Sequence, residues 1–368
     1  MAKGIEGRKL DHLSIALVRD IEASVSPGFD DVTLVHDATP ELNREDVDLS
    51  IELLNHRLRA PILIEPMTGG VPEALKINAS LAEAAEELGL GVGVGSQRAA
   101  LKDPSLRKTY RIVREKAPTT LVLANIGCSQ ILGDEGIENA MKVIEMIDAD
   151  ALSIHLNPLQ ESIQPEGETK FRGVLKAITK ITKEVKTPVI VKETGAGISI
   201  EAARKLEEAD VQIIDVAGLG GTSWASVEYY RAKASSNKTL ETLGKTFWNW
   251  GIPTVVSLIE VKAATKVKVI ASGGVRTGLD AAKSIALGAE AVGLALPLLK
   301  PAARGPKMVI ERLKIVLEEL KTAMFLTGTR NVKALRKVPV IISGKTSEWL
   351  SRRGINLDEY ARRRLGKI

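Results

Sequence analysis

The sequence contains a single cysteine, Cys128, and only 3% aromatic residues. One cysteine cannot form a disulfide within the chain. This is typical of proteins from reducing compartments, so we expect a cytoplasmic location. Scarce aromatic residues leave no stacking motif for nucleic-acid bases, and the net charge is only +5. The basic run Arg362–Arg364 is expected to be a solvated or subunit-facing tail, so the sequence indicates no nucleic-acid partner.

Long apolar runs are also missing. No run reaches the roughly 18 residues that a membrane-spanning helix needs. The first residues, MAKGIEGRKLDHL, lack the apolar segment of a secretory signal peptide. We therefore expect no membrane partner.

The sequence does contain a regular alternation of short apolar runs and amphipathic segments. The predicted strands are residues 61–64, 90–96, 120–125, 151–156, 188–192, 211–216, a run from 267, and 291–295. The predicted helices are residues 72–88, a region ending at 117, 137–147, 171–185, 199–209 and 307–326. Eight strands joined by helical crossovers favour the α/β class and a (β/α)8 TIM barrel. An open, doubly wound sheet is the alternative.

The chain is longer than one barrel requires. Its 368 residues exceed the roughly 250 that are typical of this fold. We expect an N-terminal extension over residues 1–60 that contributes to the site, a barrel over 61–330, and a C-terminal extension over 331–368. Residues 232–251, between the sixth and seventh strands, are predicted to form a long loop that covers a ligand or contacts a neighbouring subunit.

Polar residues stand at nearly every predicted strand end. Active-site groups in such barrels lie at the carboxyl ends of the strands. A single Asn or Thr at one of these positions is more often a turn cap. A full ring converging on one opening indicates a binding site. Its main members are Thr68, Ser96, Asn125, His155, Asn157, Lys192 and Thr222.

The seventh strand runs into a glycine turn, Ser272-Gly273-Gly274, followed by Arg276. Glycines let the backbone approach a ligand closely, and their N–H groups can point at an anion. Barrel phosphate sites lie after the seventh and eighth strands. The turn is therefore predicted to bind phosphate, although two glycines alone also fit an ordinary tight turn.

Three charged or titratable positions at the mouth have two readings each. Lys192 ends an apolar strand and needs an anionic partner, which is either a reduced flavin or a carboxylate such as Glu193. His155 is either a satisfied core histidine or, given its spacing to Asn157, part of a polar substrate pocket. Glu161 is either a surface residue or a ligand for a hard divalent cation, with substrate phosphates and waters completing the shell.

The N-terminal pair Arg8-Lys9 is a further candidate. It can bind phosphates from the N-terminal extension, although basic termini are commonly just solvated.

Taken together, these motifs resemble type 2 isopentenyl-diphosphate isomerase, an FMN-dependent barrel family. The similarity runs from Arg8-Lys9 to Pro297. Its motifs are MTGG at 67–70, GVGSQR at 93–98, ANIG at 124–127, HLNPLQE at 155–161, KETGAGIS at 192–199 and GLGGTSW at 218–224. HLNPLQE is the most distinctive, whereas many FMN barrels share the glycine turn. Beyond Asn331 no motif is recognised.

The resemblance implies a role for each motif residue. Expected at the flavin are Met67, Thr68, Gly69, Ser96, Asn125, Lys192 and Thr222, with Gly273, Gly274, Arg276, Ala295 and Leu296 around its phosphate end. Expected at the diphosphate substrate are Arg8, Lys9, Arg98, His155, Asn157 and Gln160, with Glu161 on Mg²⁺.

The implied reaction converts isopentenyl diphosphate to dimethylallyl diphosphate without net redox change. The family requires reduced FMN, whose N5 region is the favoured acid–base group, and NADPH is the expected reductant. No side chain is an obvious lone acid for protonating an alkene, so His155, Gln160 and Lys192 are expected to support the flavin. A homotetramer or larger homo-oligomer is expected.

The main rival is an FMN-dependent 2-hydroxy-acid oxidoreductase, which shares the glycine turn and the strand-five lysine. That family carries a catalytic histidine just before a glycine after strand six, where this sequence has Leu219. None of the four histidines is suitably placed along the sequence. A non-enzymatic flavin- or phosphate-binding barrel is the third possibility.

Overall fold

The computed structural model describes residues 5–365, and its centre is a closed barrel of eight parallel strands. Their order around the barrel follows the chain, and pairing of Val292 with Ile62 closes it. The strands are β4 (Ile62–Ile64), β5 (Gly91–Gly93), β6 (Val122–Gly127), β7 (Ala151–His155), β8 (Val189–Lys192), β9 (Ile213–Asp215), β10 (Lys268–Ala271) and β11 (Ala291–Leu294). The predicted (β/α)8 barrel is confirmed, and the open sheet is excluded.

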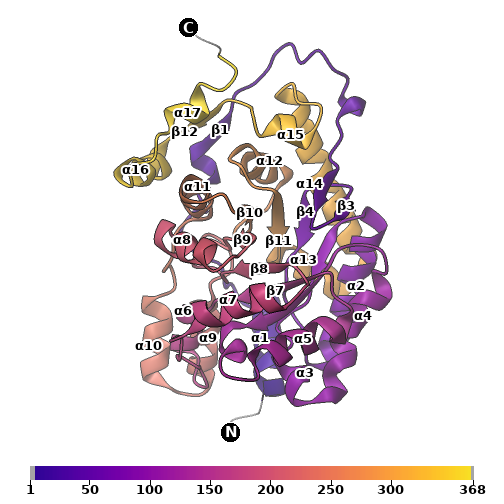
Figure 1. Cartoon of the computed structure of the whole chain (residues 1–368), viewed down its shortest axis with the longest axis vertical. Coiled ribbons are helices and arrows are strands. Elements are labelled where there is room, and N and C mark those ends of the chain that lie inside the picture. The colour runs from indigo at the N-terminus through magenta and orange to yellow at the C-terminus, as the bar shows by residue number, and fades with distance from the viewer. Residues whose placement is uncertain (1–4, 366–368) are drawn as a thin grey trace.

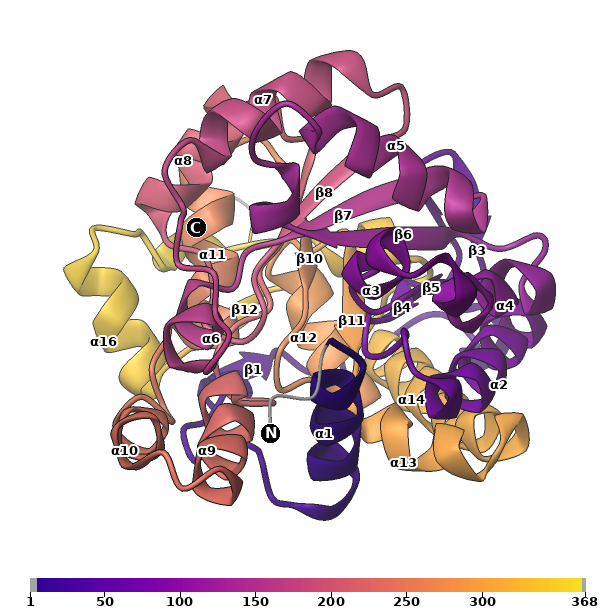
Figure 2. The ribbon, with the colours of Figure 1, turned by 90° about the horizontal axis from the view of Figure 1, so that it is seen from below.

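Helices surround the strands, as Figures 1 and 2 show. The outer helices are α2 (Pro72–Leu88), α4 (Lys108–Lys116), α5 (Gly136–Ile147), α7 (Val174–Glu184), α8 (Ile200–Glu208), α11 (Thr254–Ala264), α12 (Gly278–Ala286) and α14 (Pro306–Leu326). Most predicted helices agree within a few residues. The predicted strands 90–96 and 211–216 are longer than the observed β5 and β9. Single hydrogen bonds to the neighbouring strands nevertheless continue past both, from the Val94 N–H to Leu123 and from the Val216 N–H to Ile270.

Shorter elements connect these units. They are η1 (Phe29–Asp31), η2 (Arg44–Asp46), α3 (Arg98–Lys102), η3 (Pro104–Arg107), η4 (Cys128–Ile131), α6 (Pro158–Ile163), α13 (Leu296–Arg304), α15 (Val332–Leu335) and α17 (Asp358–Ala361). Within residues 5–365, no helix is both long and apolar enough to cross a bilayer.

Side chains from the strands fill the barrel interior. Leu63, Ile190 and Ile270 belong to one buried cluster that also contains Leu53 and Leu58. These two leucines lie on β2 (Ile51–Leu53) and β3 (His56–Leu58), a hairpin that precedes the barrel. The cluster includes the first residues of several strands, so the hairpin closes the amino-terminal end. The opposite end, where the strands finish, is the one left for a ligand.

The segment predicted as a loop over 232–251 is mostly helical, so that prediction was wrong. It is formed by the end of α9 (Trp224–Ala234) and by α10 (Lys238–Thr246), which pack against each other. The side chain of Asn237 accepts a hydrogen bond from the Leu240 N–H at 3.1 Å and so starts the second helix. The Ser/Asn cluster is therefore a helix cap inside a helical hairpin.

The two chain extensions contact each other. Strand β1 (Val32–Leu34) pairs antiparallel with β12 (Val340–Ile342). Helix α16 (Gly344–Arg352) then packs near α11, where the Trp349 indole N–H donates to the buried Glu260 carboxylate at 2.9 Å. At the other end of the molecule in Figure 1 lies α1 (Ile5–Val18), on the side where the strands finish.

The contact between α12 and α14 offers a test of packing. A Cβ added at Gly278 would lie 2.0 Å from the Val316 carbonyl oxygen and 2.4 Å from the Leu320 nitrogen. We predict that Gly278→Ala lowers the free energy of unfolding by about 2 kcal/mol, because backbone atoms cannot move aside cheaply. Urea unfolding measures it. Glu311→Ala, at an exposed position of α14, should change stability by less than about 0.5 kcal/mol. Equal effects would contradict this account of the contact.

Candidate active site

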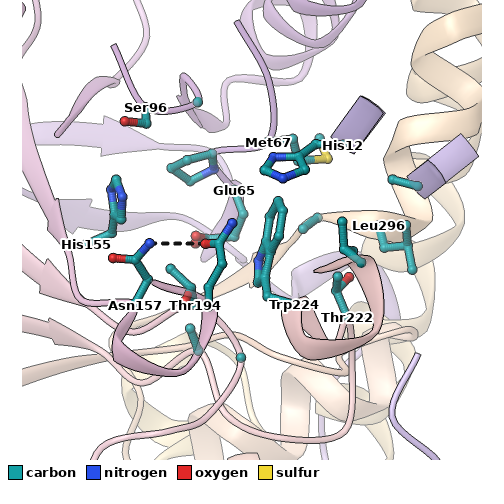
Figure 3. A pocket seen from close by; sticks show the side chains of 18 of the residues that line it. His12, Glu65, Met67, Ser96, His155, Asn157, Thr194, Thr222, Trp224 and Leu296 are labelled. Carbon is teal, nitrogen blue, oxygen red and sulfur yellow. Dashed lines mark hydrogen bonds between the residues drawn. The ribbon is translucent and has the colours of Figure 1, made fainter. Parts of the chain in front are cut away.

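A pocket opens where the barrel strands end, and α1 forms one of its walls (Figure 3). It brings together all the predicted site residues but one. They are Arg8, Lys9, Met67, Thr68, Ser96, Arg98, Asn125, His155, Asn157, Gln160, Glu161, Lys192, Thr222, Gly273, Gly274, Arg276, Ala295 and Leu296.

The exception, Gly69, lies behind the lining. A Cβ there would lie 2.0 Å from the ring of Tyr110, and its φ of 151° disfavours a side chain. Tyr110 in turn donates from its hydroxyl to the Ser96 carbonyl at 2.8 Å. Because Gly69 has no side chain, the Met67–Thr68 turn can pack against the buried Tyr110 ring. The same side chain is hydrogen-bonded to Ser96, at the end of the next strand.

The floor of the pocket carries a buried ionic trio. The Lys192 ammonium lies 3.3 Å from an Asp215 oxygen and 3.5 Å from a Glu65 oxygen, and donates to the Glu193 carbonyl at 2.8 Å. Burial alone would lower the pKa of Lys192, but Asp215 and Glu65 raise it above its usual value. Burial raises the pKa of Glu65 to about 8, with Asp215 adding to the shift.

The alternative reading of Lys192 is thus partly right. It is paired with carboxylates, but not with that of Glu193, which accepts from the N–H groups of Thr194 at 2.6 Å and Gly195 at 2.8 Å. Glu65 and Asp215 were missed. In the sequence, each is a single carboxylate at the end of an apolar strand or inside one. That pattern could have indicated a buried ionic group at both positions.

His155 is held as a neutral side chain. Burial lowers its pKa to about 3, and the nearby cations Lys192 and Lys9 contribute. Its Nδ1 lies 2.8 Å from the Asn125 side-chain oxygen, whose own amide nitrogen donates to the Val94 carbonyl at 3.1 Å. That second bond fixes the orientation of the amide, so Nδ1 carries the proton and Nε2 is left as an acceptor.

Helix α6 presents Asn157, Gln160 and Glu161 to the pocket. The Asn157 amide donates to Gln160 and to Glu161, both at 3.1 Å (Figure 3 draws one bond from Asn157). The other Glu161 oxygen accepts from the Glu168 N–H at 2.7 Å. Among the residues described, no group of three or more His, Cys, Asp or Glu side chains could hold a metal. A cation here would have Glu161 plus ligands from outside the protein.

Three cations converge beside α6. Lys9 donates to the Ser96 carbonyl at 2.8 Å, Arg8 lies 4.0 Å from Glu166, and Arg98 pairs with Glu168. Burial lowers the pKa of Lys9 to about 7, with Arg8 and Arg98 adding to the shift. Arg8 and Arg98 therefore have carboxylate partners, whereas Lys9 is bonded to a carbonyl beside two like charges, so a bound anion would favour its charged form.

The glycine turn follows β10, which is the seventh barrel strand as predicted. Gly273 and Gly274 have φ values of 98° and 72°, and a Cβ at Gly273 would lie 2.2 Å from the Gly218 carbonyl oxygen. The turn is thus packed against the loop after β9. Arg276 pairs with Glu22 and donates to the Val275 carbonyl at 2.9 Å.

A third buried carboxylate, Glu228 on α9, was also missed. It accepts from His12 at 2.8 Å and from Arg231 at 2.7 Å. His12 also stacks edge-on against Trp224, with ring centroids 5.2 Å apart. Both rings line the pocket (Figure 3). Arg8 and His12 are one helical turn apart in the sequence. That spacing could have indicated that His12 faces the same site as Arg8.

Comparison with known proteins gives the class first. A family model described as FMN-dependent dehydrogenase matches residues 137–341. Solved structures of mandelate oxidase variants align with TM-scores of 0.60 and 0.62 at 17% and 18% identity, each covering 92% of this chain. The chain has the FMN-dependent dehydrogenase type of barrel.

Curated relatives narrow this further. Proteins named isopentenyl-diphosphate delta-isomerase are 53% identical in Methanosarcina mazei and 48% identical in Pyrococcus furiosus. These alignments cover 96% and 97% of this chain, and 96% and 91% of the relatives. The chain belongs to the isopentenyl-diphosphate delta-isomerase family. The resemblance found in its motifs is confirmed, and so is the prediction of an isomerase.

Proposed function

We propose that this protein converts isopentenyl diphosphate to dimethylallyl diphosphate, using reduced FMN and Mg²⁺ with no net redox change. The observation that carries the proposal is the layout of one pocket. A cation cluster of Arg8, Lys9 and Arg98 and the carboxylate of Glu161 lie at its side, and Lys192 lies on its floor. The names of the relatives agree with this substrate.

The strand ends and glycine turn are suited to FMN. Bound there, reduced FMN would supply a proton donor and acceptor beside the substrate, with its N5 region as the acid–base group. We assign the ring to Met67, Thr68, Gly69, Ser96, Asn125, Lys192 and Thr222, and the phosphate end to Gly273, Gly274, Arg276, Ala295 and Leu296.

The protein's own side chains bind and orient the substrate. We assign the diphosphate to the cation cluster, because Lys9 is buried beside Arg8 and Arg98, which lower its pKa, and an anion there would favour its charged form. With its pKa lowered to about 3, His155 is not in the imidazolium form at neutral pH and is not the general acid, so it serves as a hydrogen-bonding group with Asn157 and Gln160. The isoprene chain fits the apolar part of the lining, which includes Leu13 and Trp224.

Glu161 is assigned to Mg²⁺. Its carboxylate is buried and fixed by Asn157 and by the Glu168 N–H, which suits a single protein ligand that shares the ion with a diphosphate and waters. The ion would neutralise charge on the diphosphate and anchor it beside α6.

Three further features complete the proposal. NADPH is the proposed reductant of the flavin, and the protein acts in the cytoplasm. The working form is a homotetramer or larger homo-oligomer, and a monomer by light scattering would contradict it.

A 2-hydroxy-acid oxidoreductase is the alternative that this fold allows. Leu219 occupies the place of the required histidine and is buried, with its N–H bonded to the Ile252 carbonyl at 2.9 Å. Of the two histidines in the lining, His155 is neutral and hydrogen-bonded to Asn125, and His12 is bonded to Glu228.

An anaerobic assay separates the two reactions. With FMN reduced, Mg²⁺ present and isopentenyl diphosphate added, we predict dimethylallyl diphosphate by NMR with no stoichiometric consumption of reductant. Oxidised FMN should give no product. One reductant oxidised per product formed would exclude the isomerase reaction.

For Glu161, we predict that Glu161→Gln lowers activity more than about tenfold and raises the Mg²⁺ concentration needed for half-maximal rate. The amide keeps the shape but loses the charge that holds the cation. FMN affinity should be unchanged, because Glu161 is assigned to the substrate side. Glu184→Gln, the same charge change at an exposed position of α7, is the control. Mg²⁺-independent activity of the wild type would refute the assignment.

For Arg276, we predict that Arg276→Ala weakens FMN binding about tenfold or more, since a guanidinium–phosphate pair is charge-assisted and often bidentate. Riboflavin, which lacks the phosphate, should bind both proteins about equally. Fluorescence titration measures both affinities, and Arg304→Ala, at an exposed end of α13, controls for charge. An equal loss for riboflavin would show that Arg276 does not act on the phosphate.

A further inference from the structure

The ionic trio on the floor contains one carboxylate more than its ammonium can neutralise. Lys192, Glu65 and Asp215 are only 8%, 5% and 1% exposed. They come from the ends of three strands, β8, β4 and β9. In the barrel order, β4 lies opposite β8, so the Glu65 side chain reaches across the interior to meet Lys192. Two ionised carboxylates there would leave a buried negative charge, which is costly.

The two carboxylates have different surroundings. Asp215 accepts from the Ser272 hydroxyl at 2.7 Å and from the Ala217 N–H at 3.2 Å, in addition to its contact with Lys192. Glu65 has Lys192 and Asp215 as its side-chain partners and is pressed against Gly293, where a Cβ would lie 2.2 Å from its oxygen. Asp215 is therefore the better-stabilised anion, and Glu65 the better site for a proton.

The pKa directions agree with this geometry. Burial and the charge of Asp215 raise the pKa of Glu65, while Lys192 opposes them. Two other titratable groups lie close to the trio. His155 pairs with Lys192 in the β7–β8 register and is neutral. Glu193 contributes to raising the pKa of Lys192, and its carboxylate accepts from the backbone N–H groups of the residues that follow it. No further cation reaches Glu65 from these strands in the part of the chain that the structure describes.

We propose that Glu65 is a positioning residue that keeps a proton directed at Asp215, so that the floor beneath the pocket carries no net charge. The positive charge of Lys192 is then balanced by the negative charge of Asp215 alone. If Glu65 were also ionised, the two carboxylates would leave a net negative charge beneath a bound ring. An anionic ring such as that of reduced FMN meets no excess negative charge. This functional part rests on the proposed FMN site, whereas the proton on Glu65 does not.

Infrared spectroscopy of the flavin-free protein tests the proton directly. At neutral pH, the difference between wild type and Glu65→Gln should contain the carbonyl stretch of one protonated carboxyl, shifted in D₂O. Glu193→Gln is measured in parallel because burial also raises the pKa of Glu193, to about 7. In Asp215→Asn, Glu65 becomes the sole counter-ion of Lys192 and ionises, so the same band should disappear.

The sign of the pH dependence provides a check on the wild type alone. Raising the pH through about 8 ionises Glu65, so the carbonyl band of its protonated form should fade over that range. This measurement uses the wild type, so it remains informative even if a variant fails to fold. A spectrum without the band at neutral pH, or a band that survives in Glu65→Gln, would overturn the proposal.

The midpoint potential of bound FMN tests the functional part. Above the pKa of Glu65, a new negative charge beneath the ring disfavours the reduced form, so the potential of the wild type should fall more steeply with pH than that of Glu65→Gln. Identical pH profiles would refute the effect on the flavin. Failure to bind FMN at all would instead refute the proposed cofactor site and leave the infrared result standing.

Discussion

Closure of the parallel sheet between β11 and β4 is the constraint on which the site depends. Because every strand runs the same way, closure gathers eight strand ends at one opening. It also sets Glu65 on β4 opposite Lys192 on β8, so that their charges meet across the barrel. The β2–β3 hairpin closes the other end, and the polar strand ends are left facing α1.

Burial shifts the pKa values of several groups in the pocket. The pKa of Lys9 and that of His155 are lowered, and that of Glu65 is raised, in each case first by burial. Such shifts mean that burial disfavours the charged forms of these groups in the ligand-free protein. A negatively charged ligand beside Lys9 would favour its charged form.

The sequence predicted the barrel, and all but one of the predicted site residues line the pocket, because both follow from local patterns. Apolar runs mark strands, and residues such as Asn125 and Thr222 stand where those runs end. It left open that Lys192 pairs with a carboxylate but did not identify Glu65 and Asp215, since both are separated from it along the chain and approach only after closure. His12 and Glu228 were missed for the same reason, because their contact joins residues 216 positions apart. The 232–251 segment was wrongly predicted to be a loop, because the polar residues that cap α10, such as Asn237, are also typical of loops.

The segment that follows α1 is joined to the loop after β9 in the manner of an added strand. The Ala23 N–H donates to the Gly221 carbonyl, the Ser223 N–H donates to the Ile21 carbonyl, and Glu22 forms a bridge with Thr222 and pairs with Arg276. The helix that walls the pocket and the loops assigned to the flavin are thus one bonded unit. The barrel is therefore not a separable module: transplanting its strand-end loops into another scaffold would not carry the site unless the N-terminal segment went with them.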